Sequence, residues 1–154
     1  MLLTFMPLLL SATSSTGNSI QCYNNINNYQ TSYSSSYIDN SNTINFSQEL
    51  QKNIELINSY KNLDDNWNGY GALKFSESVI DNALYVLYFL SRQPDVFPTG
   101  RNSIQFEYEK DNGDYLEFEI YEDHITAFKI IASEETECQV SAKETRKMVV
   151  DFYA

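Results

Sequence analysis

Basic side chains are few in this chain of 154 residues. Ten Lys and Arg stand against 21 Asp and Glu, so the formal net charge is −11. A protein that binds nucleic acid directly needs a basic surface, because much of its affinity comes from displacing the counterions of the phosphates. The cations here are scattered along the sequence. Direct nucleic-acid binding is therefore disfavoured, and a basic protein is the more natural partner.

Histidine and cysteine are rarer still, with one histidine, His124, and two cysteines, Cys22 and Cys138. Three such residues are too few for a zinc site built from Cys and His. We therefore predict no metal and no cofactor. Two cysteines also argue against a disulfide framework, which makes a cytoplasmic setting the default. No Ser-His-Asp order and no Cys-His pair can be defended, so we assign no catalytic residue.

Long apolar runs are missing as well. The N-terminal run MLLTFMPLLL is too short to span a bilayer. A signal peptide normally begins with basic residues, and residues 1–45 contain no Lys or Arg. We predict no membrane span and a cytoplasmic protein, with export as the alternative.

Residues 1–45 differ in composition from the rest of the chain. After the apolar start they are rich in Ser, Asn, Thr and Tyr, as in CYNNINNYQTSYSSSY, and they show neither helical nor alternating periodicity. Such a stretch buries too little apolar surface to offset the entropy of ordering it. We predict a disordered tail over residues 1–45 and a single domain over residues 46–154.

Helical spacing of apolar residues recurs three times in that domain. The first helix follows Asn45 or Ser47, either of which can cap it. The second follows Ser76, has a broad apolar face and stops before Pro94. The third opens with Ser141 and Glu144, which are spaced as a capping box.

Alternating residues predict three strands between the second and third helices: SIQFEYEK, DYLEFEIY and HITAFKII. The first two are joined by a Gly-containing turn. A three-residue loop, Asp111 to Gly113, keeps apolar residues opposite one another, whereas a two-residue turn would mix the faces. The predicted order is two helices, a three-stranded antiparallel sheet and a C-terminal helix, which is an α+β fold.

This register places four glutamates on the outer face of the hairpin: Glu107, Glu109, Glu117 and Glu119. Like charges directly opposite one another, such as Glu107 and Glu117, are unfavourable. A solvated strand face is the structural interpretation. The functional interpretations are a docking surface for a basic partner, a divalent-ion site, or a carboxylate pair of the glycosidase kind.

A glycine-rich loop holds the only tryptophan, in the stretch DDNWNGYGALK. Gly69 and Gly71 permit positive φ, so Trp67 and Tyr70 can fold back on the domain as a structural corner. The alternative is a ligand or peptide groove. Arg101, in the turn FPTGRNS, either pairs with a carboxylate such as Asp64 or Asp65, or acts as an anion clamp.

The segments NWNGYGA, FPTGRNSIQFEYE and GDYLEFEIYED together resemble a family of small uncharacterised bacterial proteins. Its members carry a W-D-G-Y-G-A loop, a following helix and an acidic hairpin, and the likeness covers about residues 46–125. Asn68 stands where the family usually has Asp. The resemblance implies no catalytic residues, and it suggests an inhibitor-like, antitoxin-like or regulatory role in an accessory, mobile-element or defence gene context.

We therefore predict a non-catalytic acidic module that binds a basic protein through Glu107, Glu109, Glu117 and Glu119. A nucleic-acid mimic is one version of this function, since rows of carboxylates imitate phosphates. The alternative is a small enzyme or ligand binder that uses Trp67, Tyr70 and Arg101.

Overall fold

The computed structural model describes residues 40–154, with side chains from Phe46 onward. These residues form an α+β fold of three α-helices and one antiparallel sheet. The elements in chain order are α1 (Asn40–Ser59), the 3-10 turn η1 (Tyr60–Asn62), α2 (Glu77–Phe89), β1 (Asp95–Thr99), β2 (Ser103–Glu109), β3 (Tyr115–Ile120), β4 (Ile125–Ile131), β5 (Glu134–Val140) and α3 (Ala142–Phe152). The tail predicted over residues 1–45 lies outside the described residues up to residue 39.

The three predicted helices are present, and two of them start where their caps were expected. The Ser76 side chain accepts a hydrogen bond from the Val79 amide at the start of α2. Ser141 and Glu144 form the predicted capping box of α3. The first helix begins earlier than expected, at Asn40, so Asn45 and Ser47 lie inside it and do not cap it.

The sheet has five strands in the order β1-β2-β3-β4-β5, not the predicted three. β1 was missed because it is short and contains Pro98, which a sheet tolerates only at an edge. β5 was missed because EETECQV is rich in Glu and only its last residues, Cys138 and Val140, alternate as apolar side chains. The turn before it uses Ala132 and Ser133 at positive φ, where a tight hairpin usually shows Asn-Gly.

The predicted register of the β2–β3 hairpin is confirmed. Phe106 lies opposite Phe118, and Tyr108 lies opposite Leu116. Gly113 has a φ of 85°, as the left-handed position of a three-residue loop requires. The loop is closed by a hydrogen bond from the Lys110 amide to the Asp114 carbonyl, 3.0 Å long.

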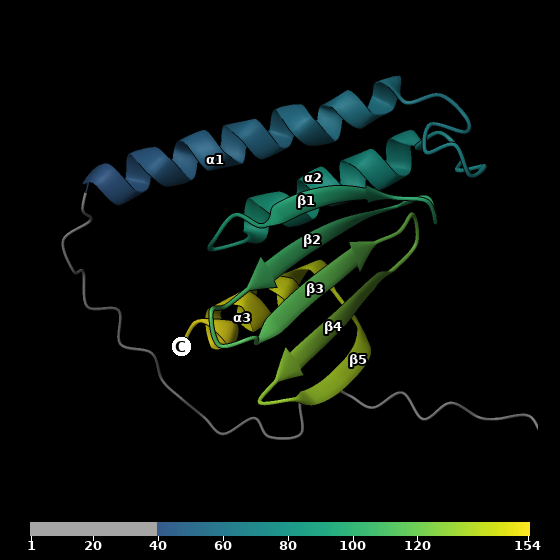
Figure 1. Ribbon diagram of the computed structural model, residues 1–154. Helices are drawn as coiled ribbons and strands as arrows, with labels where there is room; N and C mark the ends of the chain where they lie inside the picture. The colour runs from purple at the N-terminus through teal and green to yellow at the C-terminus, as the bar shows by residue number, and fades with distance from the viewer. Residues whose placement is uncertain (1–39) are drawn as a thin grey trace, which may run out of the picture.

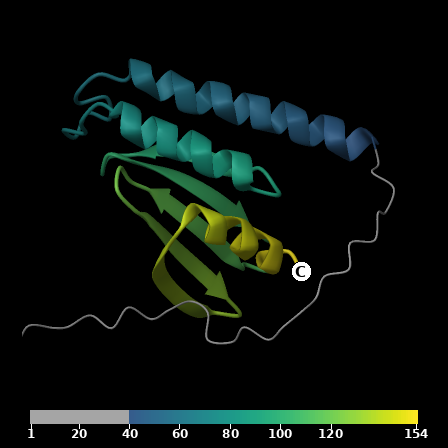
Figure 2. The ribbon, with the colours of Figure 1, turned by 180° about the vertical axis from the view of Figure 1, so that it is seen from behind.

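Helices cover only one face of the sheet. Figure 1 shows α2 and α3 behind the sheet, and Figure 2, seen from the other side, shows them in front of it. α1 packs along α2 and reaches β1 at the edge of the sheet. The core lies between sheet and helices, with Phe106, Phe118 and Ile80 fully buried. No element of residues 40–154 covers the opposite face, which we call the outer face.

Candidate functional site

The outer face is strongly acidic. Residues paired across neighbouring strands point to the same face, so the register defines three parallel rows on it. The Glu119 row contains Phe97, Gln105, Glu119, Thr126 and Gln139; the Glu117 row contains Asp95, Glu107, Glu117, Phe128 and Glu137; the third row contains Glu109, Tyr115, Ile130 and Glu135. These rows carry seven carboxylates, so the acidic face extends beyond the predicted hairpin onto β1 and β5.

Glu119 is held by the turn between β1 and β2. The Arg101 guanidinium donates two hydrogen bonds to its carboxylate, from Nε to Oε1 at 2.7 Å and from Nη2 to Oε2 at 2.8 Å. The hydroxyl groups of Ser103 and Thr99 also donate to Oε1. The prediction that Glu119 projects into solvent is therefore wrong: only 7 % of the residue is exposed. Asp64 and Asp65, the predicted partners of Arg101, are not used.

The local environment keeps Glu119 ionised. Burial alone would raise the pKa of this carboxyl, but the hydrogen bonds from Arg101 and Ser103 outweigh that effect and leave the pKa below its usual range. The same fork raises the pKa of Arg101. This end of the outer face is consequently a satisfied ion pair with little charge left for a partner.

The Glu117 row has no such cation. Glu107 lies directly opposite Glu117, and neither forms an ion pair with a described residue. The Tyr115 hydroxyl donates to Glu117 Oε2 at 2.8 Å, and Gln105 Nε2 donates to Glu107 Oε1 at 2.5 Å. Partial burial, together with the like charges of Glu119 and Glu107, raises the pKa of Glu117 despite the bond from Tyr115. This row presents anionic charge that the fold leaves unneutralised.

The loop around Trp67 is built as a structural corner. Its indole Nε1 donates to the Leu73 carbonyl at 3.2 Å, and its ring packs 5.9 Å from the Phe75 ring centroid. Gly69 and Gly71 both adopt positive φ, which permits the tight path of the chain. Tyr70 is 94 % exposed and takes no part in this packing.

The same loop contacts the turn that carries Arg101. Asn68 Oδ1 accepts hydrogen bonds from the amides of Tyr70 and Ala72, which fixes the side chain. Its Nδ2 atom lies where it would be 2.9 Å from a Cβ atom at Gly100. The structure thus brings the predicted Trp67, Tyr70 and Arg101 segments together, but the Arg101 fork is used by Glu119 and the Trp67 ring by the core.

Three residues whose hydroxyl groups donate hydrogen bonds to Glu117 or Glu119 were not singled out from the sequence: Thr99, Ser103 and Tyr115. Extending the alternation of β2 back by one step would have placed Ser103 on the face of Gln105 and Glu107. Thr99 could not have been found, because it depends on β1, the short strand that contains Pro98.

The one histidine and the cysteines of the chain were assigned no catalytic or metal-binding role from the sequence. His124 Nδ1 lies 2.6 Å from Asp123 Oδ1, and its ring stacks on Tyr121 at 4.4 Å. Cys138 is disulfide-bonded and not a free thiol, whereas a count of two cysteines argues against a disulfide framework. The other cysteine of the chain, Cys22, lies outside the described residues.

Within residues 40–154, no three His, Cys, Asp or Glu side chains are grouped as ligands of one metal ion would be. None of the helices in the described part combines the length and the apolar character that a bilayer-spanning segment needs. Comparisons with protein-family models, with curated proteins and with solved structures find no match for this chain.

Proposed function

We propose that this protein is a non-catalytic binding module that presents the outer face of its sheet to a basic protein. The observation that carries the proposal is the charge of that face. Its three rows hold seven carboxylates, and Arg101 is the one cation of the described residues that forms an ion pair with them, so seven minus one leaves a net charge of −6. No described helix covers this charge.

Such a surface suits a partner segment rich in Lys and Arg. Complementary charge accelerates encounter and excludes acidic competitors, and rim charges act mainly on the association rate. Aromatic side chains lie among the carboxylates: Phe97 is exposed, and Phe128 belongs to the Glu117 row. A Lys or Arg side chain can contact a ring face and a carboxylate together, which adds cation–π energy to the ion pair.

Several biological roles fit this surface chemistry. Rows of carboxylates imitate phosphates, so a basic protein that normally binds nucleic acid is one partner class. An inhibitor-like or antitoxin-like role is the one that the resemblance of residues 46–125 to small bacterial proteins would suggest. The alternative ligand site at Trp67, Tyr70 and Arg101 has less support, because Glu119 already occupies the Arg101 fork.

The test is a binding titration of the full chain with a labelled Lys- and Arg-rich peptide, at low and moderate salt. Glu107→Gln with Glu117→Gln removes two charges from the centre of the outer face. Glu55→Gln with Asp81→Asn removes two exposed charges from α1 and α2 and is the matched control. We expect the first pair to weaken binding about tenfold, equivalent to ~1.4 kcal/mol, and to reduce the salt dependence.

The control pair should change affinity by less than about twofold. Equal losses from both pairs would mean that the peptide responds to net charge and not to this surface. Unchanged binding after Glu107→Gln with Glu117→Gln would remove the Glu117 row from the interface.

A further inference from the structure

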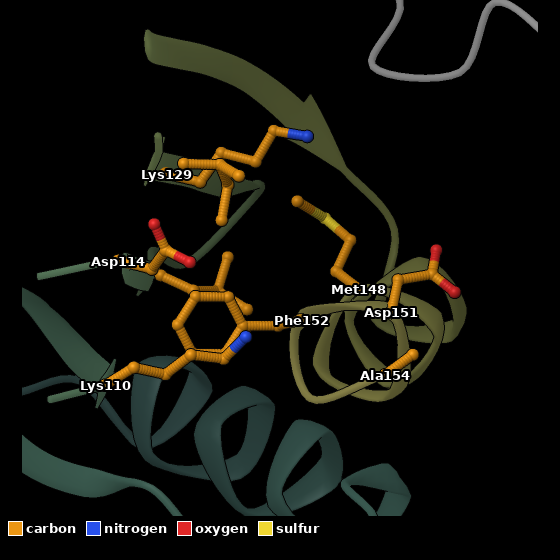
Figure 3. A pocket seen from close by; sticks show the side chains of 9 residues that line it. Lys110, Asp114, Lys129, Met148, Asp151, Phe152 and Ala154 are labelled. Carbon is orange, nitrogen blue, oxygen red and sulfur yellow. The ribbon is translucent and has the colours of Figure 1, made fainter. Parts of the chain in front are cut away.

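A separate cavity of about 220 Å³ lies on the helix-covered side of the domain, between β4 and the end of α3 (Figure 3). Three buried apolar side chains line it: Leu116, Met148 and Phe152. An apolar protein cavity of roughly 150 Å³ is enough to hold benzene, so this space accommodates a small organic molecule. The cavity is independent of the outer face, since the sheet separates the two.

Lys129 is a charged residue on the face of the sheet that otherwise carries buried apolar side chains here. It pairs in register with Leu116, on the same face as the pair formed by Ala127 and Phe118, which is the face that packs against the helices. Every other residue in these two pairs is buried and apolar. Lys129 nevertheless forms no ion pair with a described carboxylate. Lys129 therefore places a positive charge without an ion-pair partner among the described residues beside an apolar cavity.

A second lysine reaches the cavity from the β2–β3 loop. Lys110 Nζ lies 4.6 Å from the centroid of the Phe152 ring, and Figure 3 shows its chain beside that ring. It too forms no ion pair among the described residues. The two ammonium groups therefore flank an apolar floor.

The two carboxylates at the rim are already engaged. Asp151 pairs with Lys147 at 2.6 Å and points away from the Phe152 ring in Figure 3. Asp114 accepts hydrogen bonds from the Ala132 amide and from Asn112 Nδ2, each 3.0 Å long. The Ala132 bond is the main reason that the pKa of Asp114 is lowered, with a smaller contribution from the charge of Lys110. The rim charges without an ion pair among the described residues therefore include both lysines, Lys110 and Lys129.

We propose that this cavity binds a small amphipathic carboxylate. The apolar body of the ligand lies against Leu116, Met148 and Phe152, and its carboxylate is bound by Lys129, on the side of the cavity opposite Lys110. This division of labour, with an apolar lining and few polar groups that fix orientation, is typical of small-molecule sites. If instead the lysine stems only cover apolar surface and hold their ammonium groups in water, the cavity has no preference for an anion.

The probe is 3-phenylpropanoate, with the neutral 3-phenylpropanamide as its matched partner. Both are titrated into the full chain and followed by amide chemical shifts in ¹H–¹⁵N NMR spectra. We expect saturable shifts at Leu116, Lys129 and Phe152 with a Kd of about 1 mM or tighter, and about tenfold weaker binding of the amide.

Lys129→Met keeps the length and the apolar stem of the side chain and removes the charge. It should weaken 3-phenylpropanoate binding about tenfold and leave the amide unchanged. Lys143→Met removes an exposed lysine from the first turn of α3, away from the cavity, and serves as the control for net charge. Unchanged spectra confirm that both variants are folded before they are titrated.

Three results would overturn the proposal: no saturable shifts around the cavity, equal affinity for the acid and the amide, or equal losses from Lys129→Met and Lys143→Met. The outer face plays no part in this experiment, and Glu107→Gln with Glu117→Gln should leave 3-phenylpropanoate binding unchanged.

Discussion

Glu117 and Glu119 are two residues apart on β3 and point to the same face of the sheet, yet the fold treats them in opposite ways. Glu119 is gripped by Arg101 and Ser103, and its pKa is lowered. Glu117 meets another glutamate across the strand pair, and its pKa is raised. The alternation that puts a carboxylate on a sheet face does not decide its role. Its cross-strand and turn neighbours decide it.

The outer face therefore holds two kinds of carboxylate: one that the fold uses in an internal ion pair, and others that remain available to a partner. The Glu119 row is the one nearest the β1–β2 turn, where the Arg101 fork and two hydroxyl groups satisfy the Glu119 carboxylate. The Glu117 row lies farther from this turn, and no cation of the described residues forms an ion pair with it. A basic partner therefore gains most by binding the Glu117 row and little by competing for Glu119.

The largest effect is expected from Arg101→Ala. It leaves the buried Glu119 carboxylate without its cation, which costs 3–5 kcal/mol in a fully buried pair. Because the Arg101 side chain is 63 % exposed, we expect a smaller loss, about 2 kcal/mol in the free energy of unfolding by urea.

The pH dependence of this loss has a defined sign. Since the folded-state pKa of Glu119 is lowered, its stabilising contribution is complete above the usual glutamate pKa and is lost as the pH falls through the lowered value. The gap between wild type and Arg101→Ala should narrow over that range. Arg101→Lys keeps the positive charge but cannot form two parallel hydrogen bonds, so its free energy of unfolding should lie between those of wild type and Arg101→Ala. A stability unaffected by Arg101→Ala would contradict the structural role of the pair.

A smaller effect is expected from Gly100→Ala. The added Cβ would lie 2.9 Å from Nδ2 of Asn68, whose side chain is held by two backbone amides. We expect a loss of about 1 kcal/mol, measured by urea unfolding. In the background Asn68→Ala, where that atom is absent, the same substitution should cost less. Additive losses would show that the glycine loop and the Arg101 turn are not coupled.

Removing charge from the Glu117 row should stabilise the protein slightly. Glu107→Gln with Glu117→Gln relieves a like-charge pair directly across two strands, so we expect a gain of about 0.5 kcal/mol at neutral pH. Thermal unfolding measures this gain when the double variant is compared with the control variant, Glu55→Gln with Asp81→Asn. A marked loss of stability would show that these glutamates hold internal partners, as Glu119 does.

The smallest effect is the pH dependence of Glu117→Gln alone. Because the folded-state pKa of Glu117 is raised, the ionised side chain destabilises the fold above that pKa, and this penalty disappears as the pH falls to the usual glutamate pKa. Glu117→Gln should therefore be more stable than wild type at neutral pH, and the two free energies of unfolding should become equal in acid. If the variant were instead less stable than wild type at neutral pH, ionised Glu117 would be stabilising the fold, as Glu119 does.

Much of the fold follows from local patterns in the sequence. The capping residues Ser76 and Ser141 and the alternation around Phe106 and Phe118 mark elements that the structure confirms. The edge strands escape such reasoning. β1 carries a proline, and β5 follows a turn of Ala132 and Ser133, whose positive φ values are set by the pairing of the strands and not by residue preference.

For the candidate site, the sequence predicts which side of the sheet a residue lies on, but not which residues it contacts there. Period-2 alternation places four glutamates of the hairpin on one side, and the register bears that out. It does not predict that Arg101 reaches Glu119, because the contact depends on the β1–β2 turn and β1 was missed. Lys129 shows the same limit, since its unusual position is visible only once its partner Leu116 is known.

The most direct test of the account is a ¹³C NMR titration of the side-chain carboxyls of Glu107, Glu117 and Glu119 in the folded protein. The account predicts that Glu119 titrates below the usual glutamate range and Glu117 above it, and that Arg101→Ala raises the Glu119 pKa. Glu117 and Glu119 titrating together, or Glu119 unmoved by Arg101→Ala, would contradict the division between a satisfied row and a free row.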